Sequence, residues 1–104
     1  YAHKLLTGRW DEFESLRTFG GISGYTKPSE SKHDYFVAGH SSTSISLGVG
    51  AAKAIELKNE QDSRIPVVMI GDGATTAGMV YEALNELGDR KYPMVIILND
   101  NEMS

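Results

Sequence analysis

Two short apolar runs, each ending abruptly in polar residues, are the feature that most constrains this chain. The first run, Val67–Ile70, ends in Gly71-Asp72-Gly73, and the second, Met94–Leu98, ends in Asn99-Asp100-Asn101. A continuous apolar run of this length is typical of a strand that is covered on both faces. The sequence therefore predicts two buried strands, each finishing in oxygen-bearing side chains.

The segment between the two runs has the spacing of an amphipathic helix. From Thr75 or Thr76 onward, apolar side chains recur at intervals of three and four residues, and Gly88 is placed to end the helix. A strand, a helix and a second strand in this order almost always form a parallel pair with a right-handed crossover. The chain is therefore expected to be α/β with a parallel sheet. The apolar positions are Val80, Ala83, Leu84 and Leu87.

A further helix is expected before the first strand. Any residue of Ser41–Thr43 is a suitable N-cap, and the helical pattern runs to about Leu57. Gly48 and Gly50 each lower helix stability by about 1 kcal/mol relative to Ala, so close packing against a neighbour is expected to compensate.

The N-terminal third shows weaker patterns. No period is visible over His3–Gly8, whereas Asp11 and Glu14 have the spacing of a capping box and predict a brief helix. Residues 24–34 are polar and are expected to form a loop. A loop of that length raises the question of a function, and a mobile surface excursion is an equally good interpretation.

Composition and charge exclude several classes of protein. The chain has 104 residues, no cysteine, a formal net charge of -4 and no run of Lys or Arg. These features argue against a nucleic-acid partner or an anionic membrane surface, and they exclude disulfides and thiolate metal sites. The apolar runs are too short to span a bilayer. We expect a soluble, cytoplasmic protein in which residues 1–104 form a single partial domain of a longer chain.

Both polar strand ends are expected at the edge of the sheet where α/β proteins bind ligands. The glycines beside Asp72 allow a sharp turn, and the N–H groups that open the next helix favour an anion. The Asp72 carboxylate and the Asn101 carboxamide suit Mg²⁺ held jointly with a diphosphate. An ordinary turn followed by a polar strand exit is the alternative. Thr76 replaces the third glycine of a dinucleotide fingerprint, and no P-loop sequence occurs.

These motifs resemble the thiamine diphosphate signature of transketolase-like enzymes. More narrowly, the chain is similar along its whole length to the 1-deoxy-D-xylulose-5-phosphate synthase family. The run Gly39–Ser46 distinguishes that family from other transketolase relatives, and Ala2 departs from it because Pro is more usual there. The other matching segments are His3–Arg9, Ser23-Gly24, Glu30-Ser31, Gly71–Ala74, Thr76–Gly78 and Leu98–Ser104.

The resemblance implies a thiamine-diphosphate-binding domain with three α/β/α layers, of which this chain is the diphosphate and metal part. Asp72 and Asn101 would ligate Mg²⁺, and the backbone carbonyl of Met103 is a candidate third ligand. Residues on two sides would contact the cofactor. They are Gly39, His40, Ser41, Gly73, Ala74 and Asn101.

The resemblance also implies a reaction, the decarboxylating condensation of pyruvate with D-glyceraldehyde 3-phosphate, which opens the non-mevalonate isoprenoid pathway. The implied enzyme is a cytoplasmic homodimer, or a plastid enzyme in a plant or alga. No glutamate of this chain is a candidate for activating the cofactor, so we expect the isolated chain to be inactive. Another thiamine enzyme, such as transketolase, and a non-enzymatic phosphate-binding α/β module are the alternatives.

Several polar residues have a structural interpretation beside the functional one. His40 is either a surface residue beside a helix N-cap or, as the resemblance favours, a cofactor or substrate contact whose role in proton transfer stays open. His3 and His33 are expected on the surface. Glu30 and Ser31 either lie near the site or are simply solvated.

Overall fold

A computed structural model describes residues 1–101 of the chain. The chain divides into two compact units, Tyr1–Gly39 and His40–Ser104. Each unit buries side chains of its own. The assignment of residues 1–104 to a single partial domain stays a prediction. Within residues 1–101, no helix has the length and apolar character needed to cross a membrane.

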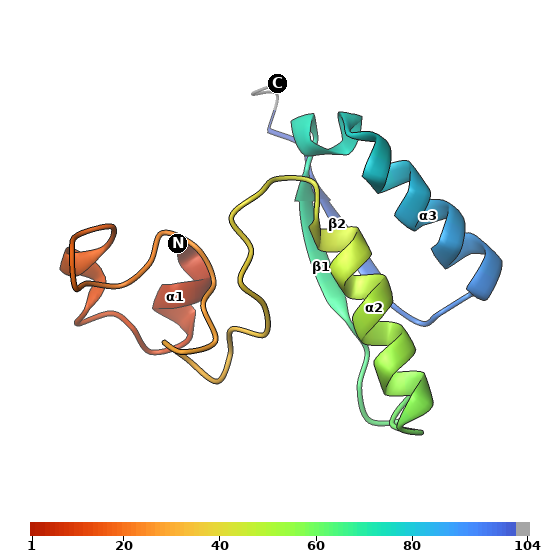
Figure 1. Ribbon diagram of the computed structural model, residues 1–104, viewed down its shortest axis with the longest axis horizontal. Helices are drawn as coiled ribbons and strands as arrows, with labels where there is room; N and C mark the ends of the chain where they lie inside the picture. Colours follow the sequence, from red (N-terminus) through yellow and green to blue (C-terminus); the bar gives the residue numbers. More distant parts are fainter. Residues whose placement is uncertain (102–104) are drawn as a thin grey trace. The chain divides into compact units, whose positions relative to one another are not determined.

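The second unit is a strand–helix–strand arrangement preceded by a further helix (Figure 1). Its two strands pair in parallel, which confirms the predicted α/β class and parallel sheet. The preceding helix ends where the sequence predicted. The elements are α2 (Ser44–Leu57), β1 (Val67–Gly71), the short 3₁₀ turn η2 (Gly73–Thr76), α3 (Gly78–Arg90) and β2 (Val95–Asn99).

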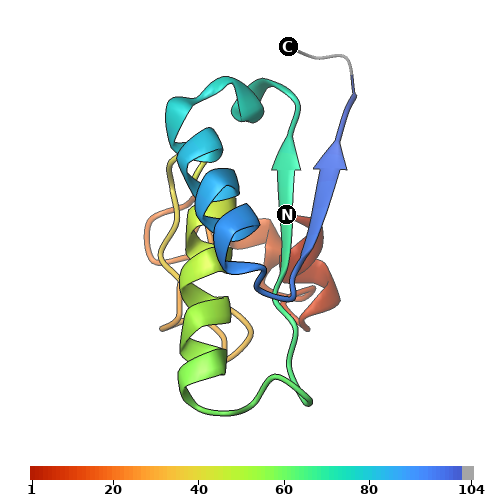
Figure 2. The same ribbon diagram turned by 90° about the vertical axis from the view of Figure 1, so that its right-hand side faces the viewer.

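Both α2 and α3 lie on the same face of the two-stranded sheet (Figure 2). Along β1, Ile70 is buried and Val68 packs against the same core, whereas Val67 and Met69 are each 62% exposed. The prediction that the strands are covered on both faces is therefore wrong for the described residues. Alternation of side chains along a strand places these exposed residues on the face that no described helix covers. The core consists of Ile45, Val49, Ile70, Val80 and Ala83.

Gly48 lets α2 approach the sheet closely. A Cβ atom built at this position would lie 2.6 Å from Cγ1 of Val68 and 2.6 Å from Cε of Met94. Gly50 has nothing within 4 Å of the same construction. The close packing that was expected to compensate for the low helix propensity of glycine is therefore present at Gly48 and absent at Gly50.

The boundaries of α3 differ from the prediction at both ends. The helix begins at Gly78 after the extended residue Ala77, because Gly73–Thr76 form a separate 3₁₀ turn. It also runs past Gly88, and its C-cap is Lys91 in the left-handed conformation with φ 56°. The prediction that Gly88 caps the C-terminus of this helix is therefore wrong. The predicted apolar stripe holds at Val80, Ala83 and Leu87, whereas Leu84 is 39% exposed.

The first unit contains little regular structure. Its elements are α1 (Ala2–Leu6) and the single 3₁₀ turn η1 (Phe13–Ser15), joined by loops. The sequence did not predict α1, because five residues are too few to show a helical period. The predicted capping box at Asp11 and Glu14 is wrong, since the N-cap of η1 is Glu12 and no side chain caps it.

Candidate functional site

The predicted metal ligands leave the sheet from two hydrogen-bonded strands. Gly71 lies opposite Asn99 in the parallel register, and the backbone N–H of Asp72 donates to the Asn99 carbonyl at 3.2 Å. Asp72 is the next residue after β1, and Asn101 is the second after β2. Neighbouring strands lie about 4.8 Å apart, so the sheet brings both residues to the same edge.

A compact turn fixes the backbone directly after β1. The Asp72 carbonyl accepts from the Thr75 N–H at 3.0 Å and from the Thr75 hydroxyl at 2.5 Å. The Thr76 hydroxyl donates to the Gly73 carbonyl at 2.8 Å. The two threonines thus close η2 through backbone carbonyls. The first N–H groups of such a turn, those of Gly73 and Ala74, have no acceptor within the turn itself.

The donor set at this edge fits a hard cation shared with phosphate oxygens. The two predicted ligands offer one carboxylate and one carboxamide, and Mg²⁺ commonly uses one or two carboxylates together with phosphates and water. No group of three His, Cys, Asp or Glu side chains within residues 1–101 could hold a metal without such help. Asp72 is half-buried and Asn101 is exposed. The candidate ligand at Met103 lies outside the described residues.

The other predicted cofactor residues fall in the segment before α2. His40 and Ser41 are exposed, and the His40 carbonyl accepts from the Thr43 hydroxyl at 3.2 Å. Figures 1 and 2 show that α2 begins at the end of the unit where β1 finishes. Gly39 belongs to the first unit, where a Cβ atom at its position would lie 3.6 Å from the Tyr25 ring.

A buried ionic cluster in the first unit escaped the sequence analysis. The Arg9 guanidinium binds Asp34 through both terminal nitrogens, Nη1 to Oδ2 and Nη2 to Oδ1, each at 2.8 Å. Lys4 Nζ donates to Glu30 Oε2 at 2.7 Å, and Arg9 lies 3.5 Å from the same oxygen. Lys4, Arg9 and Asp34 are at most 4% exposed. Charges this buried are stable only when paired and hydrogen-bonded.

The cluster also anchors the polar loop of residues 24–34. The backbone N–H of Lys27 donates to Asp34 at 2.8 Å, and that of Ser23 donates to Glu30 at 2.7 Å. Hydrogen bonding from Arg9 holds the pKa of Asp34 far below its usual range, and the Lys4 ammonium lowers the pKa of Glu30. Glu30 is therefore an ion-paired residue of this cluster, and simple solvation of its carboxylate is excluded.

His3 joins the edge of this cluster. Its Nε2 atom lies 2.9 Å from Asp34 Oδ1, and its side chain is 48% exposed while that of Asp34 is fully buried. His3 is therefore partly exposed, as expected of a surface residue, but it also contacts a buried carboxylate. The pair is separated by 31 positions in the chain, so no local pattern could have revealed it.

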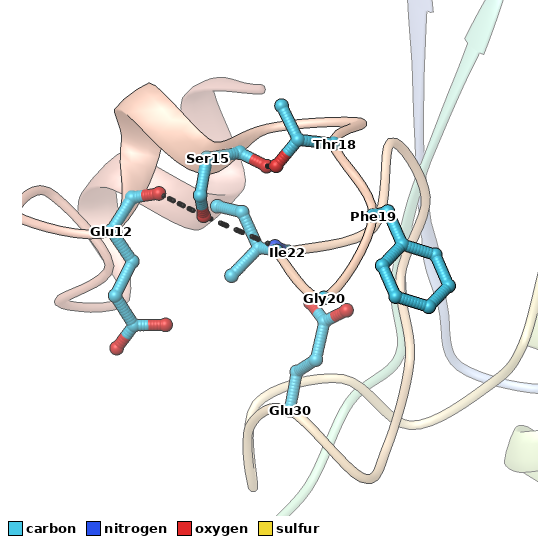
Figure 3. A pocket seen from close by; sticks show the side chains of 8 residues that line it. Glu12, Ser15, Thr18, Phe19, Gly20, Ile22 and Glu30 are labelled. Atoms are coloured by element: carbon cyan, nitrogen blue, oxygen red, sulfur yellow. Dashed lines mark hydrogen bonds between the residues drawn. The ribbon is translucent and has the colours of Figure 1, made fainter.

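An open pocket of about 470 Å³ lies in the first unit (Figure 3). Ser15 connects two other residues that line the pocket. Its hydroxyl donates to the Glu12 carbonyl at 2.7 Å and accepts from the Ile22 N–H at 3.2 Å. None of the predicted cofactor or metal residues lines it. The lining residues are Glu12, Ser15, Thr18, Phe19, Gly20, Gly21, Ile22 and Glu30.

Comparison with known proteins agrees with the sequence motifs. All of residues 1–104 match the family model described as 1-deoxy-D-xylulose-5-phosphate synthase. The chain is 86% identical to the 1-deoxy-D-xylulose-5-phosphate synthase of Sulfurimonas denitrificans and 81% identical to that of Nitratiruptor sp., in both cases over 100% of this chain and 17% of the relative. It is 67% identical to the enzyme of that name from Helicobacter pylori, over 100% of this chain and 16% of the relative. The chain therefore belongs to the 1-deoxy-D-xylulose-5-phosphate synthase family and spans about a sixth of the length of these relatives.

Proposed function

We propose that this chain is the diphosphate- and metal-binding part of a 1-deoxy-D-xylulose-5-phosphate synthase. The whole enzyme would be a transferase that condenses pyruvate with D-glyceraldehyde 3-phosphate and releases carbon dioxide, for isoprenoid and thiamine synthesis. One observation carries the proposal: Asp72 and Asn101, both inside the family match, follow residues that pair across two parallel strands.

Asp72 and Asn101 would hold Mg²⁺ through side-chain oxygens, with phosphate oxygens completing the coordination. The fixed turn Gly73–Thr76 supports this role because it sets the position of the Asp72 backbone before any ligand binds. The Met103 carbonyl remains the candidate third protein ligand.

Thiamine diphosphate, when bound, supplies the carbanion chemistry, and the protein supplies binding and orientation. The Gly73 and Ala74 N–H groups would donate to the diphosphate, and Asn101 would contact it beside the metal. Gly39, His40 and Ser41 would line the cofactor from the other side.

The remaining parts of the proposal concern the whole enzyme. We infer a homodimer in the cytoplasm in which this chain is part of a three-layer α/β/α domain. The match over the full chain favours this family over another transketolase-like enzyme or a non-enzymatic phosphate-binding module. The 104-residue chain alone should show no turnover, because it lacks a candidate for the activating glutamate.

Titration calorimetry on the full-length enzyme tests the site. Asp72→Ala should abolish Mg²⁺-dependent binding of thiamine diphosphate. Asp62→Ala, the same change at an exposed residue in the connector before β1, should leave binding unchanged. Equal binding by wild type and Asp72→Ala would refute the metal assignment and favour the interpretation of Asp72 as a turn residue.

A further inference from the structure

Two adjacent threonines hold the backbone that follows β1. The Thr75 hydroxyl donates to the Asp72 carbonyl at 2.5 Å, and the Thr76 hydroxyl donates to the Gly73 carbonyl at 2.8 Å. Each hydroxyl thus bonds the carbonyl three residues earlier in the chain. The Asp72 carbonyl also accepts from the Thr75 backbone N–H at 3.0 Å. Two successive peptide groups are therefore fixed at their oxygen atoms.

The direction of a carbonyl group also determines the direction of the N–H group that follows it. A trans peptide is planar, so its C=O and N–H bonds point in opposite directions. Fixing the Asp72 carbonyl therefore orients the Gly73 N–H, and fixing the Gly73 carbonyl orients the Ala74 N–H. These are the two N–H groups that would donate to the diphosphate in the proposed function.

The turn η2 depends on these side-chain bonds more than a longer helix would. It is a 3₁₀ helix of 4 residues without a side-chain cap at its N-terminus, and the chain becomes extended again at Ala77, with φ -75° and ψ 137°. The side chains of Ala74 and Ala77 pack against the core of the second unit. Because apolar packing is not directional, it attaches the turn without setting the rotation of its peptide groups. The threonine hydroxyls add the directional contacts.

We propose that Thr75 and Thr76 are positioning residues for thiamine diphosphate, because their hydroxyls orient the Gly73 and Ala74 N–H groups toward the diphosphate before it binds. This inference rests on the proposed function. Donors that are already oriented lose less conformational entropy when the ligand binds, so they raise its affinity. Each hydroxyl uses its single proton on a backbone carbonyl, so neither is a hydrogen-bond donor to the ligand itself.

Valine in place of either threonine removes the hydroxyl and keeps the shape of the side chain. In the full-length enzyme, Thr75→Val and Thr76→Val should each weaken Mg²⁺-dependent binding of thiamine diphosphate by about fivefold or more in titration calorimetry. Thr75→Ser and Thr76→Ser keep the hydroxyl and should bind as the wild type does. Ser63→Ala is the matched control, because it removes a hydroxyl that donates to the Glu60 carbonyl at 3.0 Å, also three residues earlier, in the connector before β1. It should leave binding unchanged.

Urea unfolding of the same variants separates positioning from a purely structural role. A structural role predicts that valine lowers the unfolding midpoint while the folded variant binds with wild-type affinity. Wild-type affinity in either folded valine variant, or an equal loss of affinity with valine and with serine, would overturn the proposal for that threonine. Asp72→Ala distinguishes this failure from failure of the proposed function, since unchanged binding by that variant would refute the metal assignment instead.

The structure of the wild-type enzyme with bound thiamine diphosphate is a test that needs no variant. We expect the Gly73 and Ala74 N–H groups to lie within hydrogen-bond distance of diphosphate oxygens, with both threonine hydroxyls still bonded to backbone carbonyls of the turn. Threonine hydroxyls that bond other atoms in that complex would overturn the proposal. A diphosphate located away from the turn would refute the proposed site, and this inference with it.

Discussion

Gly71 on β1 lies directly opposite Asn99 on β2, and this single register position sets the geometry of the proposed metal site. The Asp72 N–H extends the pairing by one hydrogen bond to the Asn99 carbonyl. A slip of one residue would turn every side chain of a strand to the opposite face. The apolar core on one side of the sheet therefore also fixes where Asp72 and Asn101 emerge.

Asn101→Ala should weaken Mg²⁺-dependent binding of thiamine diphosphate to the full-length enzyme by about tenfold or more. The change removes a neutral oxygen ligand, and tenfold corresponds to about 1.4 kcal/mol. Asn85→Ala, at an exposed position of α3, is the matched control and should bind normally. Calorimetry gives both affinities, and equal values for the two variants would contradict a ligand role for Asn101.

Gly48→Ala should destabilise the protein by about 1–3 kcal/mol. The added methyl group would lie 2.6 Å from Val68 Cγ1, and a β-branched side chain on a strand has few alternative rotamers. Gly50→Ala is the control within the same helix. Because nothing lies within 4 Å there, the change should stabilise the helix by up to about 1 kcal/mol. Urea unfolding of the full-length variants measures both, and equal effects at the two glycines would refute the close approach.

Asp34→Ala should cost about 3–5 kcal/mol, because it leaves the buried Arg9 guanidinium without its bidentate partner. Asp11→Ala, an exposed acidic residue of the same unit, should change stability by less than about 0.5 kcal/mol. Denaturant unfolding compares the two variants. A small effect at Asp34 would mean that the ionic cluster contributes little to holding residues 24–34.

The first unit should lose stability in acid. Arg9 holds the pKa of Asp34 below its unfolded value, and Lys4 does the same for Glu30. A carboxylate with a lowered folded pKa stabilises the protein fully above its unfolded pKa of about 4 and loses that contribution as the pH falls toward the folded value. The denaturant concentration at the unfolding midpoint of the wild type should therefore decrease when the pH is lowered below about 4. The Asp34→Asn variant should show a shallower drop, and an equal slope would contradict this origin.

Local sequence was enough to predict the half of the chain that carries the proposed site. Apolar periodicity gave the strand–helix–strand order, and the Gly71-Asp72-Gly73 turn marked the end of the first strand. The same local reasoning failed at the C-terminal end of α3, because the presence of a glycine does not by itself end a helix. It ended α3 at Gly88, whereas the helix continues to Arg90 and stops at the left-handed Lys91.

What the sequence determined by itself was therefore the parallel pair and the polar residues at its edge, because both follow from spacing over a few residues. Only the tertiary structure decided that α2 and α3 cover one face of the sheet, and that Arg9 and His3 meet Asp34 across 25 and 31 positions. A buried charge can pair with a residue that is distant in the sequence. The free-energy cost of leaving such a charge unpaired favours the fold that brings the two partners together. No local pattern encodes such a distance along the chain.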